Sequence, residues 1–234
     1  MRLHLVSDNN MREDNLNRLS SFQMKSHSVN YLEHHFILKG LNYAVKKYAC
    51  GNVLDIGCGN KPYSPLFQGK IDKYVGCDIV QSSSNCVDVV SEATNIPLES
   101  NQFETVFSTQ TIEHIGDFQL MLNEAFRLTK PGGFFIVAGP MYWPLHEEPY
   151  DFYRFTKHGF EFSLRKAGFT IAEIIPNGGK WALLGQVIIQ TLPVWLTFPK
   201  LLKKIHNNFF MWLDGKYFGS SNTMNYVVIA KKEI

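Results

Sequence analysis

The feature that most constrains the fold is a short apolar run that ends in two closely spaced glycines. Residues 53–60 read VLDIGCGN, so an apolar stretch leads directly into Gly57 and Gly59. Glycine adopts positive φ angles at little cost and lets a ligand approach the backbone. The pattern predicts a strand, a tight turn and then a helix whose first N–H groups face a carboxylate or phosphate. The alternative is a plain tight turn in which Asp55 caps the helix.

An acid at the end of the next apolar run adds to this pattern. Residues 73–78 read KYVGCD, and Asp78 follows Gly59 by 19 residues. A carboxylate at that position can accept hydrogen bonds from both hydroxyls of a ribose. NAD and S-adenosylmethionine both fit, but the dinucleotide fingerprint has a third glycine where this chain has Pro62. Asp55 would repel a pyrophosphate and suits a ligand with an ammonium and a sulfonium.

Short apolar runs alternate with helical periodicity along the rest of the chain. Strands are predicted at 52–56, 73–78, 86–90, 104–108, 134–138, 169–175 and 225–231, and helices at 29–48, 118–128 and 156–167. Such alternation is typical of a doubly wound α/β sheet. Thr156 is expected to cap the helix that follows it.

Composition restricts the class of protein and its partners. The chain has 234 residues, is 45% hydrophobic and 19% charged, and carries a net charge of +2. This balance is typical of a folded protein and gives no basic face for nucleic acid, so no nucleic-acid partner is expected. The four cysteines form no CxxC pair and the N-terminus lacks the apolar core of a secretory signal. We therefore expect a cytoplasmic protein with reduced thiols.

Several ordered motifs agree with one family. They are VLDIGCG (53–59), YVGCDI (74–79), EATNIPLESNQFETVFS (92–108), TIEHI (111–115) and LTKPGGFFIVAGP (128–140). Together they resemble the class I S-adenosylmethionine-dependent methyltransferases, in particular the type-11-like group. The resemblance implies a Rossmann-like, mostly parallel seven-stranded sheet with an antiparallel last strand. It also implies methyl transfer from S-adenosylmethionine to an oxygen, nitrogen or carbon of a small-molecule, glycan or lipid-linked acceptor.

The resemblance implies cofactor contacts residue by residue. The cofactor-binding residues that it assigns are Asp55, Gly57, Cys58, Gly59, Asp78, Ile79, Glu92, Ala93, Gln110 and Thr111. Asp78 would bind the ribose hydroxyls, whereas Glu92 and Ala93 would lie beside the adenine. Glu92 is one methylene longer than the family's commoner Asp. The run 82–85 shortens the link between the second and third strands, where the family's usual helix is not expected.

Candidate catalytic groups follow the fourth and fifth strands. His114, next to Glu113, is a candidate general base, because the pKa of histidine is close to neutrality. The alternative is that this pair orients loops by hydrogen bonds. No HExxH or comparable ligand spacing occurs, so no metal is expected.

The loop of residues 140–156 is long for a connection between a strand and a helix, and long loops are often functional. Its His…Asp-x-Tyr-Arg-x-Thr pattern, with Tyr153, resembles a subset of these methyltransferases in glycan and cell-surface biosynthesis. His146 is the first candidate base, with Asp151 or Arg154 orienting the acceptor. Alternatively, Asp151 and Arg154 pair to pin the loop while its aromatic residues fill the core.

Two segments lie outside the matched motifs. Residues 1–48 are predicted to form an N-terminal arm and helix, and residues 49–234 the methyltransferase domain with an apolar helical insertion at about 180–215. Residues 181–199 carry no charge and have the length of a membrane span. A single crossing would leave the last strand on the wrong side of the bilayer. Residues 181–213 are therefore interpreted as a lid, a homodimer surface or a peripheral contact with the inner membrane face.

Two other functions fit parts of the sequence. A catalytically inactive module that binds the cofactor and acts through a partner would keep Asp55, Gly57, Gly59 and Asp78 without turnover. An NAD-dependent oxidoreductase is the less favoured of the two, because Pro62 stands where the dinucleotide fingerprint has its third glycine. Retained cofactor affinity without methyl transfer would indicate the first, and selective stabilisation by NAD would indicate the second.

Overall fold

The computed structural model describes residues 24–82, 84–192 and 199–234. Most of the expected N-terminal arm and the middle of the apolar insertion, residues 193–198, lie outside the described residues. The division of the chain at residue 48 stays a prediction.

A seven-stranded sheet with the order β3-β2-β1-β4-β5-β7-β6 forms the centre of the fold. Its strands are β1 Asn52–Ile56, β2 Lys73–Asp78, β3 Val89–Val90, β4 Phe103–Thr109, β5 Thr129–Pro140, β6 Thr170–Asn177 and β7 Asn225–Lys231. Strands β1 to β5 pair in parallel, whereas β7 is antiparallel to both β5 and β6. The expected mostly parallel, Rossmann-like sheet with an antiparallel last strand is confirmed.

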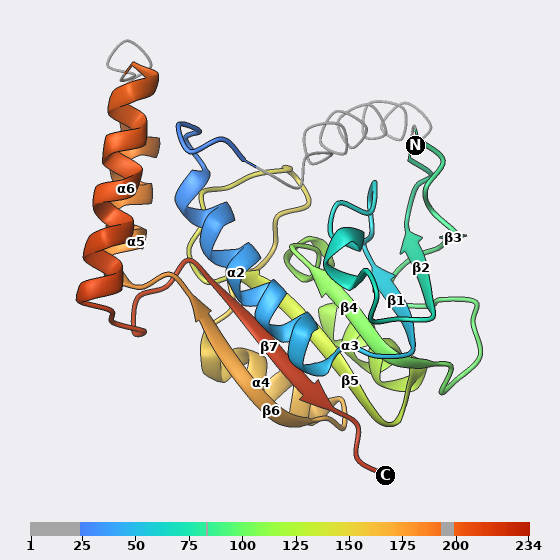
Figure 1. The fold of residues 1–234 in the computed structure, drawn as a ribbon. Helices are drawn as coiled ribbons and strands as arrows, with labels where there is room; N and C mark the ends of the chain where they lie inside the picture. Colours follow the sequence, from blue (N-terminus) through green and yellow to red (C-terminus); the bar gives the residue numbers. More distant parts are fainter. Residues whose placement is uncertain (1–23, 83, 193–198) are drawn as a thin grey trace.

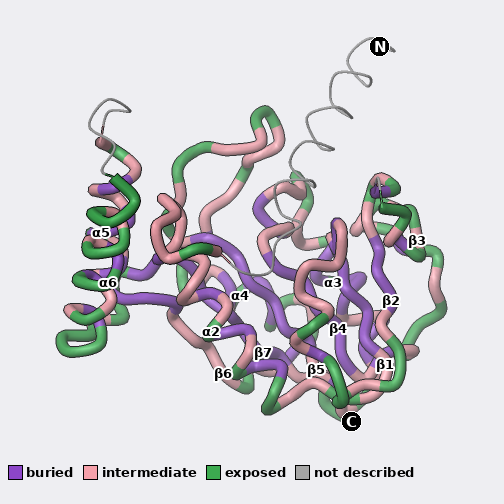
Figure 2. Tube along the Cα trace, turned by 45° about the horizontal axis from the view of Figure 1, so that its top comes forward, coloured by how far each residue is buried: buried purple, intermediate pink, exposed green. Residues whose placement is uncertain are grey.

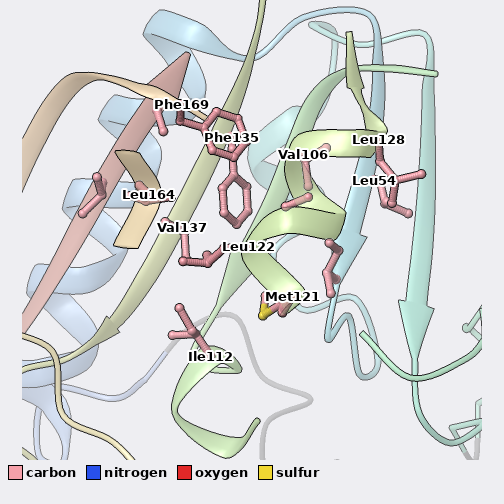
Figure 3. Close-up of a cluster of buried hydrophobic side chains, with 14 of the residues drawn as sticks. Leu54, Val106, Ile112, Met121, Leu122, Leu128, Phe135, Val137, Leu164 and Phe169 are labelled. Atoms are coloured by element: carbon pink, nitrogen blue, oxygen red, sulfur yellow. The ribbon is translucent and has the colours of Figure 1, made fainter. Parts of the chain in front are cut away.

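Helices cover both faces of this sheet (Figure 1). The helices are α2 Tyr31–Tyr48, α3 Phe118–Leu128, α4 Lys157–Lys166, α5 Lys180–Thr191 and α6 Lys200–Lys216. Helix α2 packs on one face, where Leu41 and Val45 join Ile136 in a buried cluster. Helices α3 and α4 pack on the other face (Figure 3), where Leu122 and Leu164 are fully buried. Burial of apolar surface on both faces explains why the central strands are continuous apolar runs.

The helix expected after the glycine loop does not form. Residues 57–63 are turns, and only the short 3₁₀ helix Ser64–Phe67 follows. Pro62 and Pro65 account for this, because a proline lacks an N–H donor and disfavours the α conformation in the residue before it. Lys61, which precedes Pro62, has a φ of 53°. Asp55 therefore caps no helix.

Other differences are small. Strand β3 is limited to two residues, and the described part of the link between β2 and β3 contains no helix. Strand β5 begins at Thr129 rather than Phe134, because Thr129 pairs with Phe103 of β4 across a register shift. Thr156 caps α4 as predicted, since its side chain accepts a hydrogen bond from the N–H of Gly159.

The apolar insertion begins and ends as two helices, α5 and α6, which pack against each other and against α2. Their junction with the sheet depends on Asp214 of α6, which is 1% exposed. Its carboxylate accepts hydrogen bonds from the N–H groups of Gly179, Trp181 and Ala182 at the start of α5. The outer faces of both helices are exposed, in contrast to the buried strands (Figure 2).

Among the described residues, no helix is both long enough and apolar enough to cross a membrane.

Replacing Asp214 by Ala should lower the free energy of unfolding by about 2 kcal/mol, because three N–H groups at the start of α5 lose one acceptor. Chemical denaturation measures this change. Asp117→Ala is the matched control, since Asp117 accepts a single exposed hydrogen bond at the start of α3. That variant should lose about 1 kcal/mol. Equal losses in the two variants would contradict the anchoring role of Asp214.

Candidate functional site

A cavity of about 630 Å³ opens at the carboxyl ends of the parallel strands. It lies where the strand order reverses between β1 and β4, which is where open α/β sheets bind ligands. The predicted residues that line it are Gly57, Cys58, Gly59, Asp78, Ile79, Glu92, Ala93, Gln110, Thr111, His114 and His146. Residues from five separate segments of the sequence therefore meet around one space of the size that small ligands occupy.

The glycine loop is held by backbone hydrogen bonds to β2 and is packed closely against Thr111. The N–H groups of Gly57 and Cys58 both donate to the carbonyl of Cys77 in β2. Gly57 has a φ of 77°, and a Cβ there would lie 2.2 Å from the Oγ1 of Thr111. Glycine is thus required at this position by both conformation and space.

Asp78 ends β2 beside this loop. Its Oδ2 accepts a hydrogen bond from the N–H of Gly59 at 2.9 Å, and its Oδ1 accepts one from the N–H of Ile79 at 2.7 Å. Each carboxylate oxygen keeps a free lone pair with which to accept a ligand hydroxyl. The apolar side chain of Ile79 is 46% exposed and lines the cavity, as do Glu92 and Ala93.

Asp55 lies beneath the loop, outside the residues that line the cavity. It is 2% exposed, and its Oδ2 accepts a hydrogen bond from the hydroxyl of Tyr74 at 2.6 Å. Burial raises the pKa of Asp55 to about 7, an effect that the bond from Tyr74 opposes and nearby Asp78 reinforces. The family-based role of Asp55 stays a prediction, and its observed contacts are with the protein.

A chain of polar side chains forms the floor of the cavity. Gln110, with a φ of 52°, donates from its Nε2 to the Oδ1 of Asn225 at 2.8 Å. Asn225 in turn donates to the Oε1 of Glu33 in α2 at 3.1 Å. Burial raises the pKa of Glu33 to about 7. Glu33 and Asn225 line the cavity but were not predicted. The sequence offered one indication of Glu33, namely that it is an acidic residue next to Leu32 in the apolar repeat of the predicted helix.

The two candidate histidines are in edge-to-face contact in the wall of the cavity. Their ring centroids are 4.8 Å apart, and both line the cavity. The Nδ1 of His114 contacts the carbonyl of Tyr150 at 2.9 Å, and the Nδ1 of His146 contacts the Oδ2 of Asp151 at 3.1 Å. Burial is the main cause that lowers the pKa of His146. In each ring, Nε2 is the nitrogen that these contacts leave for a ligand.

The other predicted catalytic residues, Asp151, Tyr153 and Arg154, do not line the cavity. Arg154 forms a bidentate ion pair with Asp151, at 2.6 Å and 2.7 Å, and also donates to the carbonyls of Trp143 and Pro144. This pair holds the pKa of Asp151 well below its usual range. Tyr153 donates from its hydroxyl to the carbonyl of Gly116. These three residues hold the loop in place, and Asp151 orients His146.

Glu113, next to His114, differs from the other acids of the site. It is 0% exposed, and neither carboxylate oxygen has a hydrogen-bond partner. Desolvation raises the pKa of Glu113 to about 8. A carboxyl group in such surroundings is costly unless another group compensates it.

Fold and cavity together define a Rossmann-like domain with a ligand-sized cavity at the carboxyl edge of its sheet. Comparison with known proteins gives the class: residues 54–137 match the family model described as a methyltransferase domain. The chain contains a class I S-adenosylmethionine-dependent methyltransferase domain, and the expected cofactor, S-adenosylmethionine, is confirmed.

One sequence relative and two solved structures illustrate what the chain is similar to. A probable S-adenosylmethionine-dependent methyltransferase of Mycolicibacterium smegmatis is 29% identical over 97 residues. The match spans 38% of this chain and 38% of that relative's length. The crystal structure of the [4+2]-cyclase SpnF has a TM-score of 0.59 at 16% identity, covering 87% of this chain and 83% of that one. Phosphoethanolamine N-methyltransferase 2 of Haemonchus contortus, solved with S-adenosylmethionine, has a TM-score of 0.53 at 21% identity, covering 84% and 52%.

The buried Asp55 predicts a pH-dependent stability of the ligand-free protein. Its pKa is about 7 when folded and 3.8 in the reference state, so the folded chain keeps a proton that the unfolded chain has lost. Its contribution is full below about pH 4 and is lost as the pH rises through 7. Asp55→Asn should remove roughly 2–4 kcal/mol of this decline between pH 4.5 and 7.5. Denaturation across this range, with exposed Asp72→Asn as control, measures the difference, and parallel curves for the two variants would contradict the assignment.

Proposed function

We propose that the protein transfers a methyl group from S-adenosylmethionine to an acceptor that enters the cavity beside His146. The observation that carries this proposal is the continuity of one cavity. Its wall includes both the glycine loop with Asp78 and the pair His114 and His146. A cofactor held by the first group would direct its methyl group toward an acceptor beside the second.

Methyl transfer demands mainly that two reactants be held in line. The sulfonium cofactor is intrinsically reactive, so positioning supplies much of the rate acceleration. The bond between carbon and sulfur breaks as the bond from the acceptor to the methyl carbon forms, and S-adenosylhomocysteine leaves. Under this proposal, the Nε2 of His146 takes the proton that the nucleophilic atom of the acceptor loses, while Asp151 positions the ring.

The first experiment is calorimetric titration with S-adenosylmethionine, S-adenosylhomocysteine and NAD. We expect the first two to bind and NAD not to bind. Asp78→Ala should weaken binding by at least about 2 kcal/mol, because two ribose hydroxyls lose a charged acceptor. Asp72→Ala is the control, because Asp72 is an exposed acid that immediately precedes the same strand. Binding of NAD alone would support an oxidoreductase, and unchanged affinity in Asp78→Ala would contradict the assigned cofactor site.

Turnover distinguishes an enzyme from an inactive cofactor-binding module. Release of S-adenosylhomocysteine is to be measured against panels of small hydroxylated, amine, glycan and lipid-linked acceptors. His146→Gln should keep its cofactor affinity but lower kcat by about 100-fold, because a positioned base contributes roughly that factor. Equal kcat for this variant and the natural chain would contradict the role of His146. Cofactor binding without turnover on any panel would support the inactive module.

An exposed apolar stripe on α6 favours a lipid-linked acceptor. Leu201, Ile205, Phe209 and Trp212 recur at helical spacing and are 67%, 54%, 50% and 57% exposed. Helix α6 contains four lysines, and its one acidic residue, Asp214, is buried. The exposed charge of the helix is therefore positive. No described residue of α5 or α6 lines the cavity. We propose that α6 contacts an anionic lipid surface, for which this arrangement of apolar and basic residues is suited.

Cosedimentation with vesicles of phosphatidylglycerol and phosphatidylcholine tests this contact. The protein should bind, and the double variant Ile205→Ser, Phe209→Ser should lose about 2–3 kcal/mol of binding free energy, because two apolar side chains no longer leave water. Phe162→Ser on α4 is the control, since Phe162 is an exposed aromatic residue elsewhere, at 71%. Absence of vesicle binding together with a dimer that the double variant dissociates would show that a second copy covers α6.

A further inference from the structure

The starting point is the buried, unpartnered carboxylate of Glu113. Both of its oxygens are buried and lack a hydrogen-bond partner. Its Oε1 lies 3.9 Å from the Nε2 of His114, which is too long for a hydrogen bond. A buried polar group of this kind requires a compensating ligand, and the surrounding side chains show which ligand fits.

The neighbouring side chains are arranged as metal ligands. Glu113, His114 and His146 each offer one donor atom, and these three atoms lie within 4.8 Å of one another. Donors around a tetrahedral zinc ion are about 3.3 Å apart, a spacing that small side-chain rotations can reach. The Oε2 of Glu147 is 3.8 Å from the Nε2 of His114 and supplies a fourth donor. Glu147 is held at a φ of 53°, a conformation that non-glycine residues adopt rarely.

The outer contacts of the two histidines complete this arrangement. A metal-binding histidine almost always donates its other ring N–H to a carboxylate or a backbone carbonyl. His146 has its Nδ1 on the carboxylate of Asp151, and His114 has its Nδ1 on the carbonyl of Tyr150. Both contacts fix the tautomer that leaves Nε2 unprotonated. Asp151 is itself fixed by Arg154, so the ring of His146 is held before any ligand arrives.

We propose that Glu113, His114 and His146, with Glu147 at the rim, bind a divalent transition-metal ion, for which zinc is the best match. Two imidazoles and a carboxylate are a donor set that zinc takes in proteins. The ligands come from the 3₁₀ helix Ile112–His114 and from the loop after β5, which is why no ligand spacing is visible in the sequence. The proposal reverses the expectation, drawn from that spacing, that the protein uses no metal.

The position of the site indicates what the ion would do. His114, His146 and Glu147 line the cavity, whereas Glu113 lies behind them. An ion held by Glu113, His114 and His146 would direct its fourth coordination position toward the cavity, where an acceptor oxygen would displace Glu147 from the rim. It would take an oxygen donor of the acceptor, such as a hydroxyl, carboxylate or phosphate. In the metal-loaded protein the ion, and not the imidazole of His146, contacts that oxygen. This consequence for the acceptor rests on the proposed function, whereas the metal site itself does not.

Direct metal binding tests the site without an acceptor. The full chain is stripped with a chelator and titrated with Co²⁺ and Zn²⁺, and bound metal is counted by plasma mass spectrometry. We expect one ion per chain and visible absorption bands of tetrahedral Co²⁺ that Zn²⁺ abolishes. Glu113→Gln and His146→Gln should each weaken affinity at least 100-fold. His158→Ala, which alters a histidine with an 85% exposed side chain beside Glu161, should have no effect.

Folding and cofactor binding are measured on the same variants. The unfolding midpoint of each metal-free variant shows whether it folds, and the partly exposed His146 and Glu147 provide variants if Glu113→Gln does not. Less than stoichiometric metal, or the same Co²⁺ spectrum in Glu113→Gln and His146→Gln as in the natural chain, would overturn the proposal. Titration with S-adenosylmethionine on metal-free protein reports on the cofactor site alone, so failure of the metal site and failure of the methyltransferase assignment give different results.

Discussion

Parallel pairing of β1 between β2 and β4 is the constraint on which the rest of the structure depends. Asp55 stands opposite Gly76 on one side and Phe107 on the other, so three consecutive strands run in the same direction and in register. Their loops must then leave the sheet at one edge. The glycine loop, Asp78 and Gln110 meet there because each directly follows one of these strands, and the cavity is a consequence of that register.

A second constraint acts on the opposite wall of the cavity. The loop after β5 has no secondary structure of its own, yet its polar groups are bound to one another and to the segment after β4. Arg154 joins Asp151 to two backbone carbonyls, and the N–H of Phe152 donates to the carbonyl of Glu113. These contacts offset the entropy cost of ordering a long loop and bring His146 to His114. The loop is thus held by the Asp151–Arg154 ion pair and backbone hydrogen bonds together with apolar packing, since Phe155 lies in the hydrophobic core.

Much of the fold could be predicted because its signals are local. The bounds predicted for β1, β2, α3 and β7 agree with the structure, since each is an apolar run or a periodic stretch with clear ends. The helix predicted after the glycine loop was wrong because Pro62 and Pro65 outweigh the pattern of the motif. The predicted cofactor residues line the cavity, with the exception of Asp55, whose side chain turns toward Tyr74. That direction depends on packing between strands, which no local pattern encodes.

The sequence by itself determined the class of fold, the glycine loop, the acid at the end of β2 and the presence of an unusual loop after β5. These properties depend on residues close together in the chain, whose conformational preferences act locally. Only the tertiary structure decided that Glu33 and Asn225 form a hydrogen bond at the floor of the cavity. It also decided that Asp151 contacts the ring of His146, and that Glu113 lies beside two histidines without a hydrogen-bond partner. The reason is physical: burial and hydrogen-bond partners are set by contacts between distant segments, and these contacts exist only once the sheet has formed.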